Sequence, residues 1–292
     1  MCLAEPMDRK ETHSPSGYGK PPWVFKGRAL YQLHLVKAET ARAFIPKDLR
    51  LVEAFGYTLG GFFLANYDDS PAGNFDELVV IAGLVWNRPT SSAWAARVLV
   101  NSDEACIHGR KEFGLPSQVA RFSKTMKVIP STPQTKCNGF LGMVGMFNSD
   151  SPKNSMDIQL SETKGSAAMN ICHMNISPPV TGLDSRQWMG PLIKMSLPSF
   201  CGRTKYNPHL LEYSCKIECR VKAVAPAKVL GSPPVVDMDE SKSSTELRNK
   251  KRSLSVSVLL SKPILALQFN CLEMKVEAPT MVSNRSENPL RH

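Results

Sequence analysis

Residues 108–118, which read His-Gly-Arg-Lys-Glu-Phe-Gly-Leu-Pro-Ser-Gln, decide how the fold of this chain is interpreted. The segment before them is typical of a helix start, because Asn101 can cap the helix and Glu104 can reach back to the cap. Gly109 or Gly114 would end this helix, and Pro116 would prevent its continuation. The stretch, called the focal turn below, is therefore predicted to be a turn between a helix and a strand, where a rigid scaffold often presents functional groups.

Alternating or apolar segments along the rest of the chain predict strands, and loops rich in proline, glycine and serine separate them. The predicted strands are 29–37, 51–66 (a bent pair), 75–86, 94–100, 119–128, 138–147, 156–160, 167–175, 193–197, 210–224, 226–229, 253–260 and 264–276, with a short helix at 38–44. Many strands with few, short helices predict an α+β fold that is predominantly β, an antiparallel barrel closed or nearly closed to protect its edges.

The domain organisation follows from composition. No strong internal linker interrupts residues 21–278, so we expect one domain there. Polar segments predict a flexible leader at 1–20, a mobile loop at 231–252 and a disordered tail at 279–292.

Composition excludes several classes of protein. Hydrophobic residues make up 42% and charged residues 21% of 292 residues, as in a soluble globular protein, and no apolar run is long enough to predict a transmembrane helix. The net charge is +10, but Lys and Arg are scattered and no zinc-finger, RRM or KH signature occurs, so we expect no nucleic-acid partner.

The eight cysteines are dispersed, no secretory signal precedes them, and we expect free thiols. Cys215, Ile217 and Cys219 fall on one face of an alternating segment, which indicates a core face and not a metal site. No second Cys or His pair completes a zinc set, so no metal is expected.

General catalytic motifs are missing, since there is no Gly-rich phosphate loop, nucleophile elbow, His-Glu-x-x-His or paired Cys-x-x-Cys. His108 is the one histidine near a promising turn, and a position on the helix surface is expected for it. What remains is a set of stretches defined by their order along the chain.

Four stretches in order resemble the acetoacetate decarboxylase superfamily and together cover roughly the first 125 residues. They are Trp-Val-Phe-Lys-Gly-Arg at 23–28, Ala-Arg-Ala-Phe-Ile-Pro-Lys-Asp-Leu at 41–49, Asp-Asp-Ser-Pro-Ala-Gly-Asn-Phe-Asp-Glu-Leu at 68–78, and Gly-Arg-Lys-Glu-Phe-Gly-Leu-Pro at 109–116. The resemblance implies the β-rich barrel of that family.

In that family a lysine directly follows the proline of the focal turn and forms a Schiff base with a β-keto acid, while a neighbouring lysine lowers its pKa. In this chain Ser117 and Gln118 follow Pro116. A hydroxyl and an amide cannot form the iminium ion, and Lys111 and Lys124 do not stand at the required place. We therefore expect no Schiff-base decarboxylase activity, and no cofactor.

The resemblance also implies the other pocket residues. Arg28 matches the family's substrate-binding arginine and Glu77 one of its two acids, while the second acid falls at Gly60-Gly61-Phe62. The candidate ligand pocket is Arg28, Phe62, Glu77, Ser117 and Gln118, and no catalytic residue is assigned beyond Glu77 as a candidate acid or base. The alternative is that Arg28 and Glu77 only pair with each other across the barrel.

The resemblance extends along the whole chain to one plant branch of the superfamily, which is required for making the xanthophyll neoxanthin, a carotenoid in the pathway that supplies abscisic acid. It implies a pseudoenzyme that binds an apolar isoprenoid or a carotenoid-pathway enzyme. Because members of the superfamily often form oligomers, the resemblance also implies self-association into a homo-oligomer. The alternative is an enzyme in which Glu77 is the base and Arg28 stabilises developing negative charge.

The leader carries Glu5, Asp8 and Glu11, whereas transit peptides are poor in acids. A cytoplasmic location is therefore predicted, with a plastid-associated pool as the alternative.

Overall fold

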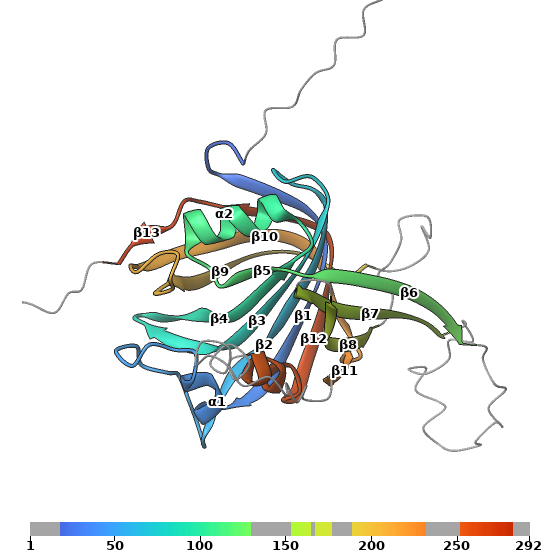
Figure 1. Cartoon of the computed structure of the whole chain (residues 1–292), viewed down its shortest axis with the longest axis horizontal. Coiled ribbons are helices and arrows are strands. Elements are labelled where there is room, and N and C mark those ends of the chain that lie inside the picture. Colours follow the sequence, from blue (N-terminus) through green and yellow to red (C-terminus); the bar gives the residue numbers. More distant parts are fainter. Residues whose placement is uncertain (1–17, 130–152, 165–166, 177–188, 232–251, 283–292) are drawn as a thin grey trace, which may run out of the picture.

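The computed structural model describes residues 18–129, 153–164, 167–176, 189–231 and 252–282 (Figure 1). The strands are β1 (Trp23–Lys37), β2 (Tyr57–Asp69), β3 (Phe75–Asn87), β4 (Thr90–Val100), β5 (Ser117–Val119), β6 (Arg121–Ile129), β7 (Lys153–Lys164), β8 (Ala167–Ile176), β9 (Leu192–Gly202), β10 (Leu210–Val224), β11 (Lys228–Gly231), β12 (Lys262–Val276) and β13 (Thr280–Met281). The helices are α1 (Ala38–Arg42), α2 (Asp103–Phe113) and an unlabelled helix at 252–259.

Seven strands form a barrel in the order β12-β1-β2-β3-β4-β9-β10, and the pairing of β10 with β12 closes it. All neighbours in the barrel are antiparallel except β4 and β9, which run parallel. The chain leaves the barrel after β4 and builds α2 and most of a second sheet, β11-β8-β7-β6, before it returns as β9. The prediction of a predominantly β, barrel-type fold is confirmed.

The strands β1 to β4 separate two apolar layers, because successive side chains point to opposite faces. Phe63, Ala65 and Tyr67 of β2 belong to the core inside the barrel, which also contains Phe113 of α2. Phe62 and Leu64 belong to a second core, between the outer face of the barrel and the second sheet, which supplies Ile158 and Leu160. Figure 1 shows α2 across one side of the barrel and β6, β7 and β8 on another. Any site residue is therefore placed inside or outside the barrel by its position in the alternation.

The focal turn folds as expected at its end but not at its start. Ser102, not Asn101, caps α2, since its side chain accepts a hydrogen bond from the Ala105 N–H. Asn101 is not available because its amide holds Asp76 of β3, both through the Asp76 backbone N–H and through its carboxylate. Gly114 ends the helix with a φ of 61°, a left-handed conformation that suits glycine, so the choice between Gly109 and Gly114 falls on Gly114.

The predicted strand at 253–260 is wrong, because residues 252–259 form a helix. Its sequence alternates Ser with apolar residues, which gave a strand pattern of period two. The buried residues, however, are Ser255, Val258 and Leu259, the three- and four-residue spacing of a helix face. The Val258 carbonyl lies 3.1 Å from Nδ1 of the buried His34, so the barrel fixes the end of this helix.

Other segments differ in detail. The stretch 51–66 contributes one long strand, β2, preceded by bridges at Leu51 and Ala54, and the predicted strand at 119–128 is divided between β5 and β6. Thr280–Met281 pairs with β10, so the tail is ordered to residue 282, further than predicted. The predicted strand at 138–147, most of the leader and the loop at 232–251 lie outside the described residues. The described helices are too short or too polar to span a bilayer.

Candidate functional site

The barrel encloses a cavity of about 410 Å³ beneath α2. Aromatic and aliphatic side chains from β1, β2, β3, β4, β9, β10, β12 and α2 dominate its lining, and the aromatic part is Tyr18, Phe25, Tyr31, Phe63, Tyr67, Phe75, Phe113, Phe200 and Tyr213. Among the described lining residues Glu77 is the one carboxylate, and none is a lysine or an arginine. An apolar concavity of this size with a few polar groups is typical of a small-molecule site.

Glu77 projects from β3 into this cavity, where the Tyr67 hydroxyl donates to its Oε2 at 2.9 Å. Burial raises the pKa of Glu77 to about 7, and the hydrogen bond from Tyr67 opposes this only in part. Burial, with the nearby Glu77 carboxylate, also raises the pKa of Tyr67, so its hydroxyl stays a donor. The pair can therefore hold or release a proton near neutral pH inside an apolar chamber.

A second polar group of the cavity is His108 of α2. Its ring stacks on Tyr18 with centroids 3.5 Å apart and meets the edge of Trp23 at 4.5 Å. Burial lowers the pKa of His108 to about 4, so the ring is neutral, and its Nε2 is buried without a hydrogen-bond partner among the described residues. The predicted position on the helix surface is wrong. Because buried polar atoms are normally paired, this nitrogen is free to bind a polar group of a ligand.

Arg28 and Glu77, matched to one site by the resemblance, lie on opposite faces of the barrel wall. The register pairs Arg28 with Asn66 and Asn66 with Asp76, whereas Glu77 stands opposite Ala65. Arg28 donates to Asn66 Oδ1 at 3.2 Å and lies 3.5 Å from Asp68. The alternative in which Arg28 pairs with Glu77 is therefore wrong.

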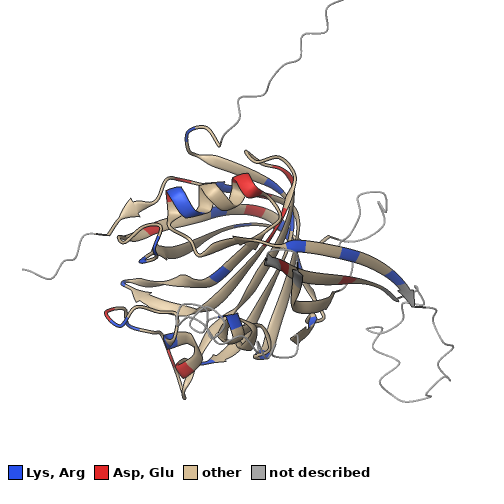
Figure 2. Ribbon diagram, in the orientation of Figure 1, with Lys and Arg blue, Asp and Glu red and all other residues tan. Residues whose placement is uncertain are grey.

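Arg28 instead lines a second pocket, of about 340 Å³, between the barrel and the second sheet. Lys124 of β6 also lines this pocket and pairs with Asp76, so it is not a displaced Schiff-base lysine. The basic residues of β6 are Arg121, Lys124 and Lys127, and Figure 2 shows blue segments along this strand. Phe62 lies in the core between the barrel and the second sheet and not in the cavity, because it alternates with Phe63.

Ser117 and Gln118 also point to different faces, as neighbours in a strand must. Ser117 pairs with Val98, which lines the cavity, and its Oγ lies 2.8 Å from where a Cβ on Gly109 would stand. Gln118 pairs with Leu99 and belongs to the outer face. Arg110 donates to the Ser117 carbonyl at 2.8 Å and fixes the turn. A lysine at 117 would point into the barrel, and one at 118 would point away from it.

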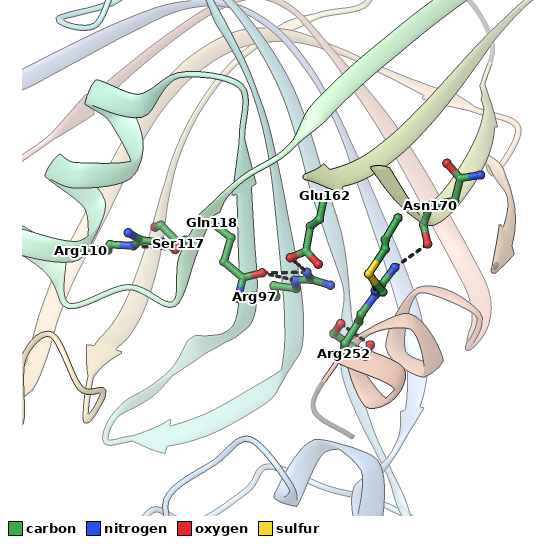
Figure 3. A network of polar contacts seen from close by, with 9 residues as sticks. Arg97, Arg110, Ser117, Gln118, Glu162, Asn170 and Arg252 are labelled. Atoms are coloured by element: carbon green, nitrogen blue, oxygen red, sulfur yellow. Dashed lines mark hydrogen bonds and ion pairs between the residues drawn. The ribbon is translucent and has the colours of Figure 1, made fainter. Parts of the chain in front are cut away.

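Gln118 is held in a buried ionic network that joins the barrel to the second sheet (Figure 3). Arg97 of β4 donates from Nε and Nη2 to Gln118 Oε1, at 3.0 and 2.7 Å, and from Nη2 to Glu162 of β7. Arg97 and Glu162 are both buried. The five residues predicted to share one pocket therefore lie in different places. Glu77 lines the cavity, and Ser117 faces its wall. Arg28 lines the second pocket, Phe62 lies in the core between the barrel and the second sheet, and Gln118 belongs to the ionic network.

The cysteine face of β10 is confirmed as part of the core. Cys215 and Ile217 line the cavity, and Cys219 is buried beside them. Burial raises the pKa of the Cys215 thiol to about 12, so the thiol stays protonated and is not an active nucleophile. In the described ranges no group of three or more His, Cys, Asp or Glu side chains is placed to hold a metal ion.

Sequence reasoning missed Tyr18, Tyr67 and His108 as cavity residues, and Arg97 with Glu162 as the partners of Gln118. Tyr18 fell in a segment called a flexible leader, although aromatic anchors at Trp23 and Phe25 follow it closely. For Tyr67 a signal existed, because it stands at an odd position of its strand, as Phe63 does. The Arg97–Glu162 contact joins strands far apart in the sequence, and no local pattern indicates it.

The raised pKa of Glu77 makes the stability of the folded protein depend on pH. The folded state keeps a proton up to about pH 7, whereas an ordinary glutamate loses it near 4.5, so the free energy of unfolding falls as pH rises between these values. At about 1.4 kcal/mol per pH unit the interval corresponds to roughly 3 kcal/mol. We expect Glu77→Gln to remove this loss, so that the variant gains on the wild type from pH 4.5 to pH 8.

Urea unfolding of both proteins across this pH range measures the difference, and Glu112→Gln on the exposed side of α2 is the matched control. An equal pH dependence in wild type and Glu77→Gln would show that Glu77 titrates normally.

The chain matches the acetoacetate decarboxylase (ADC) family model over residues 6–139. The relative named "Protein NEOXANTHIN-DEFICIENT 1" from Solanum lycopersicum is 63% identical over 289 residues, which cover 95% of this chain and 98% of the relative. The Arabidopsis thaliana protein of the same name is 59% identical and covers 94% and 99% of the two chains, and the one from Oryza sativa subsp. japonica is 57% identical over 98% and 97%.

Solved structures share the fold at low identity. The enduracididine biosynthesis enzyme MppR complexed with pyruvate superimposes with a TM-score of 0.52 at 14% identity, over 97% of this chain and all of the other. Acetoacetate decarboxylase from Legionella pneumophila gives 0.51 at 13% identity, over 96% and 98% of the chains. The predicted resemblance is confirmed, and the chain belongs to the NEOXANTHIN-DEFICIENT 1 family, a plant branch of the acetoacetate decarboxylase-like superfamily.

Proposed function

We propose that this chain supports neoxanthin formation by binding an apolar isoprenoid in the barrel cavity, without Schiff-base decarboxylation. One observation carries the proposal. The cavity keeps the barrel frame of a decarboxylase-like protein, but its described lining holds no lysine, and Ser117, at the position of the family's lysine, packs against Gly109 of α2 on the inner face of the barrel. Such a chamber favours an apolar ligand, because burying apolar surface is the main source of affinity there.

The polar groups of the cavity narrow the ligand class. The Glu77–Tyr67 pair offers hydrogen bonds in an otherwise apolar space, and so does His108 Nε2, which has no partner in the part of the chain that the structure describes. A ring that carries a hydroxyl group, such as the end ring of a xanthophyll, has the complementary chemistry. A volume of about 410 Å³ is near the lower end of small-molecule sites, so the cavity accommodates one end of a carotenoid and not the whole molecule.

Plants that lack the protein test the pathway role. We expect them to lose neoxanthin, and we expect a Ser117→Ala copy to restore it, because the hydroxyl takes no part in covalent chemistry. Normal neoxanthin in plants without any copy of the gene would exclude the role. A fluorescent fusion at the C-terminus, which leaves the leader free, would decide between the proposed cytoplasmic location and the plastid-associated alternative.

Borohydride trapping tests the absence of Schiff-base chemistry. Incubation of the purified protein with acetoacetate and borohydride should leave its intact mass unchanged, since no amine is available in the described part of the cavity. A Ser117→Lys variant is the informative comparison, because its side chain would enter the cavity. A trapped adduct in the wild type would overturn the interpretation of Ser117.

A second candidate function is direct conversion of violaxanthin to neoxanthin, which needs an acid and a base. The pKa of about 7 for Glu77, with Tyr67 as a proton donor beside it, is the observation that favours it. Arg28 takes no part in this version, because it lies on the outer face. Turnover of violaxanthin by purified protein in micelles, lost in Glu77→Gln, would support it, and absence of turnover would count against it.

A further inference from the structure

The barrel cavity opens at the end where β1 finishes and β2 begins, and apolar side chains surround this opening. Leu59 lines the cavity yet is 38% exposed, which places it at the rim. Tyr57 lies two residues earlier on the same face of β2, and Trp86 lies two residues beyond the cavity-lining Leu84 on β3. Leu265 of β12 stands opposite Leu33, which also lines the cavity. Tyr57, Trp86 and Leu265 are all at least 40% exposed, so the rim presents large apolar groups to solvent.

Phe55 extends this rim in an unfavourable conformation. It occupies the tip of the tight turn in which Ala54 and Tyr57 exchange two backbone hydrogen bonds, and its side chain is fully exposed. Its φ is 52°, a left-handed conformation in which Asn or Gly is favoured, and Gly56 follows at 78°. In the isolated chain Phe55 therefore has both an unfavourable backbone conformation and an apolar ring in contact with water. Contact with an apolar environment outside the chain would compensate for the exposed ring.

Cations flank the same opening. Lys37 stands opposite Tyr57 across β1 and β2, Lys262 stands opposite Leu35, and Arg88 lies two residues after Trp86 in the turn to β4. The backbone carbonyl of Arg50 accepts from the Trp86 N–H. All four cations are exposed, and none pairs with a carboxylate in the described part of the chain. Of the acids nearby, Glu53 is neutralised by Arg42, and Glu39 is exposed on α1.

We propose that this rim, defined by Phe55, Tyr57, Leu59, Trp86 and Leu265 with its flanking cations, docks the barrel onto an anionic lipid bilayer. Aromatic side chains favour the interface between headgroups and acyl chains, and basic side chains around them are attracted to anionic headgroups. The docked orientation would bring the cavity mouth against the lipid, so an apolar ligand could pass between bilayer and cavity without crossing water. Docking itself does not require the proposed role in neoxanthin formation.

Vesicle sedimentation with the full chain tests the docking. We expect binding to phosphatidylcholine vesicles that contain phosphatidylglycerol, weaker binding to phosphatidylcholine alone, and weaker binding at high salt. Phe55→Asn combined with Trp86→Ser should reduce the partition coefficient by about tenfold or more, since two rings that docking would bury in the bilayer are lost. Asn suits the turn conformation, so the fold should be retained. Arg88→Gln with Lys262→Gln should reduce binding only to the anionic vesicles.

The matched control is Ile107→Ser, which removes an exposed apolar side chain from α2 and should leave binding unchanged. Absence of binding to every vesicle, or equal binding by wild type and Phe55→Asn, Trp86→Ser, would overturn the proposal. Ligand binding to the protein in micelles is measured separately. A Phe55→Asn, Trp86→Ser variant that fails to dock but binds ligand normally would support the rim as the docking surface. A wild-type protein that docks but binds no ligand would contradict only the proposed function.

Discussion

Replacing Glu162 with alanine is expected to lower the free energy of unfolding by about 3–5 kcal/mol. The substitution leaves the Arg97 guanidinium buried between the barrel and the second sheet with only the Gln118 amide oxygen as a described partner. Arg97 Nη1 already lacks a hydrogen bond among the described residues, so the site has little capacity to compensate. The loss is a large part of the stability of an ordinary domain, and urea unfolding monitored by circular dichroism measures it.

Removal of both charges distinguishes the effect of a lost ion pair from the effect of the packing void that the alanine leaves. Arg97→Met combined with Glu162→Met should be much closer to wild type than Glu162→Ala, because no unpaired charge is then buried. Glu112→Ala, which removes an exposed carboxylate 4.0 Å from Lys111, should change stability by less than about 0.5 kcal/mol. An equal, small effect of Glu162→Ala and Glu112→Ala would show that the network does not hold the second sheet on the barrel.

Filling the cavity should have the largest effect on ligand binding. Ala95 lines the cavity from β4 opposite Ile81, so a phenylalanine there would occupy the space of a ligand ring. We expect Ala95→Phe to weaken xanthophyll binding by about 100-fold or more, measured by quenching of tryptophan fluorescence in micelles. Introduced into plants that lack the protein, the same variant should fail to restore neoxanthin.

The control for this change is Ala278→Phe, an equal addition of volume at an exposed position between β12 and β13. It should bind and complement like wild type. Because overpacking alone can destabilise a core, the melting temperature of Ala95→Phe has to be compared with that of the wild type. Ala93→Leu is a milder variant, since it adds less volume to the same wall of the cavity. Normal binding by a folded Ala95→Phe protein would place the ligand outside the cavity.

Local sequence features predicted much of the architecture. Alternation located most of the long strands, and Gly114 followed by Pro116 marked the end of α2, because one needs a left-handed residue and the other cannot continue a helix. The failure at 253–260 has a definite cause. A run of alternating Ser and apolar residues satisfies a strand pattern, while packing against the barrel selected a helix face through Ser255, Val258 and Leu259.

The candidate site was predicted less well than the fold, because a site depends on which face each residue occupies. Matching Arg28, Glu77, Ser117 and Gln118 one by one to the family put them in one pocket. The strand register separates Arg28 and Gln118 from the other two. The position of a residue in the sequence determines which face of the barrel it occupies only when the strand register and the bulges are known. For example, the register shifts between Val80, which stands opposite Arg97, and Ile81, which stands opposite Ala95, so simple alternation fails there.

Native mass spectrometry of the purified chain with violaxanthin or neoxanthin tests most directly that the barrel interior is a non-covalent binding site. We expect one ligand per chain in the wild type, none in Ala95→Phe, and complete release of the ligand on denaturation. A wild type without bound xanthophyll, or an equal signal from Ala95→Phe, would contradict the assignment of the cavity. A mass increment that survives denaturation would contradict its non-covalent chemistry.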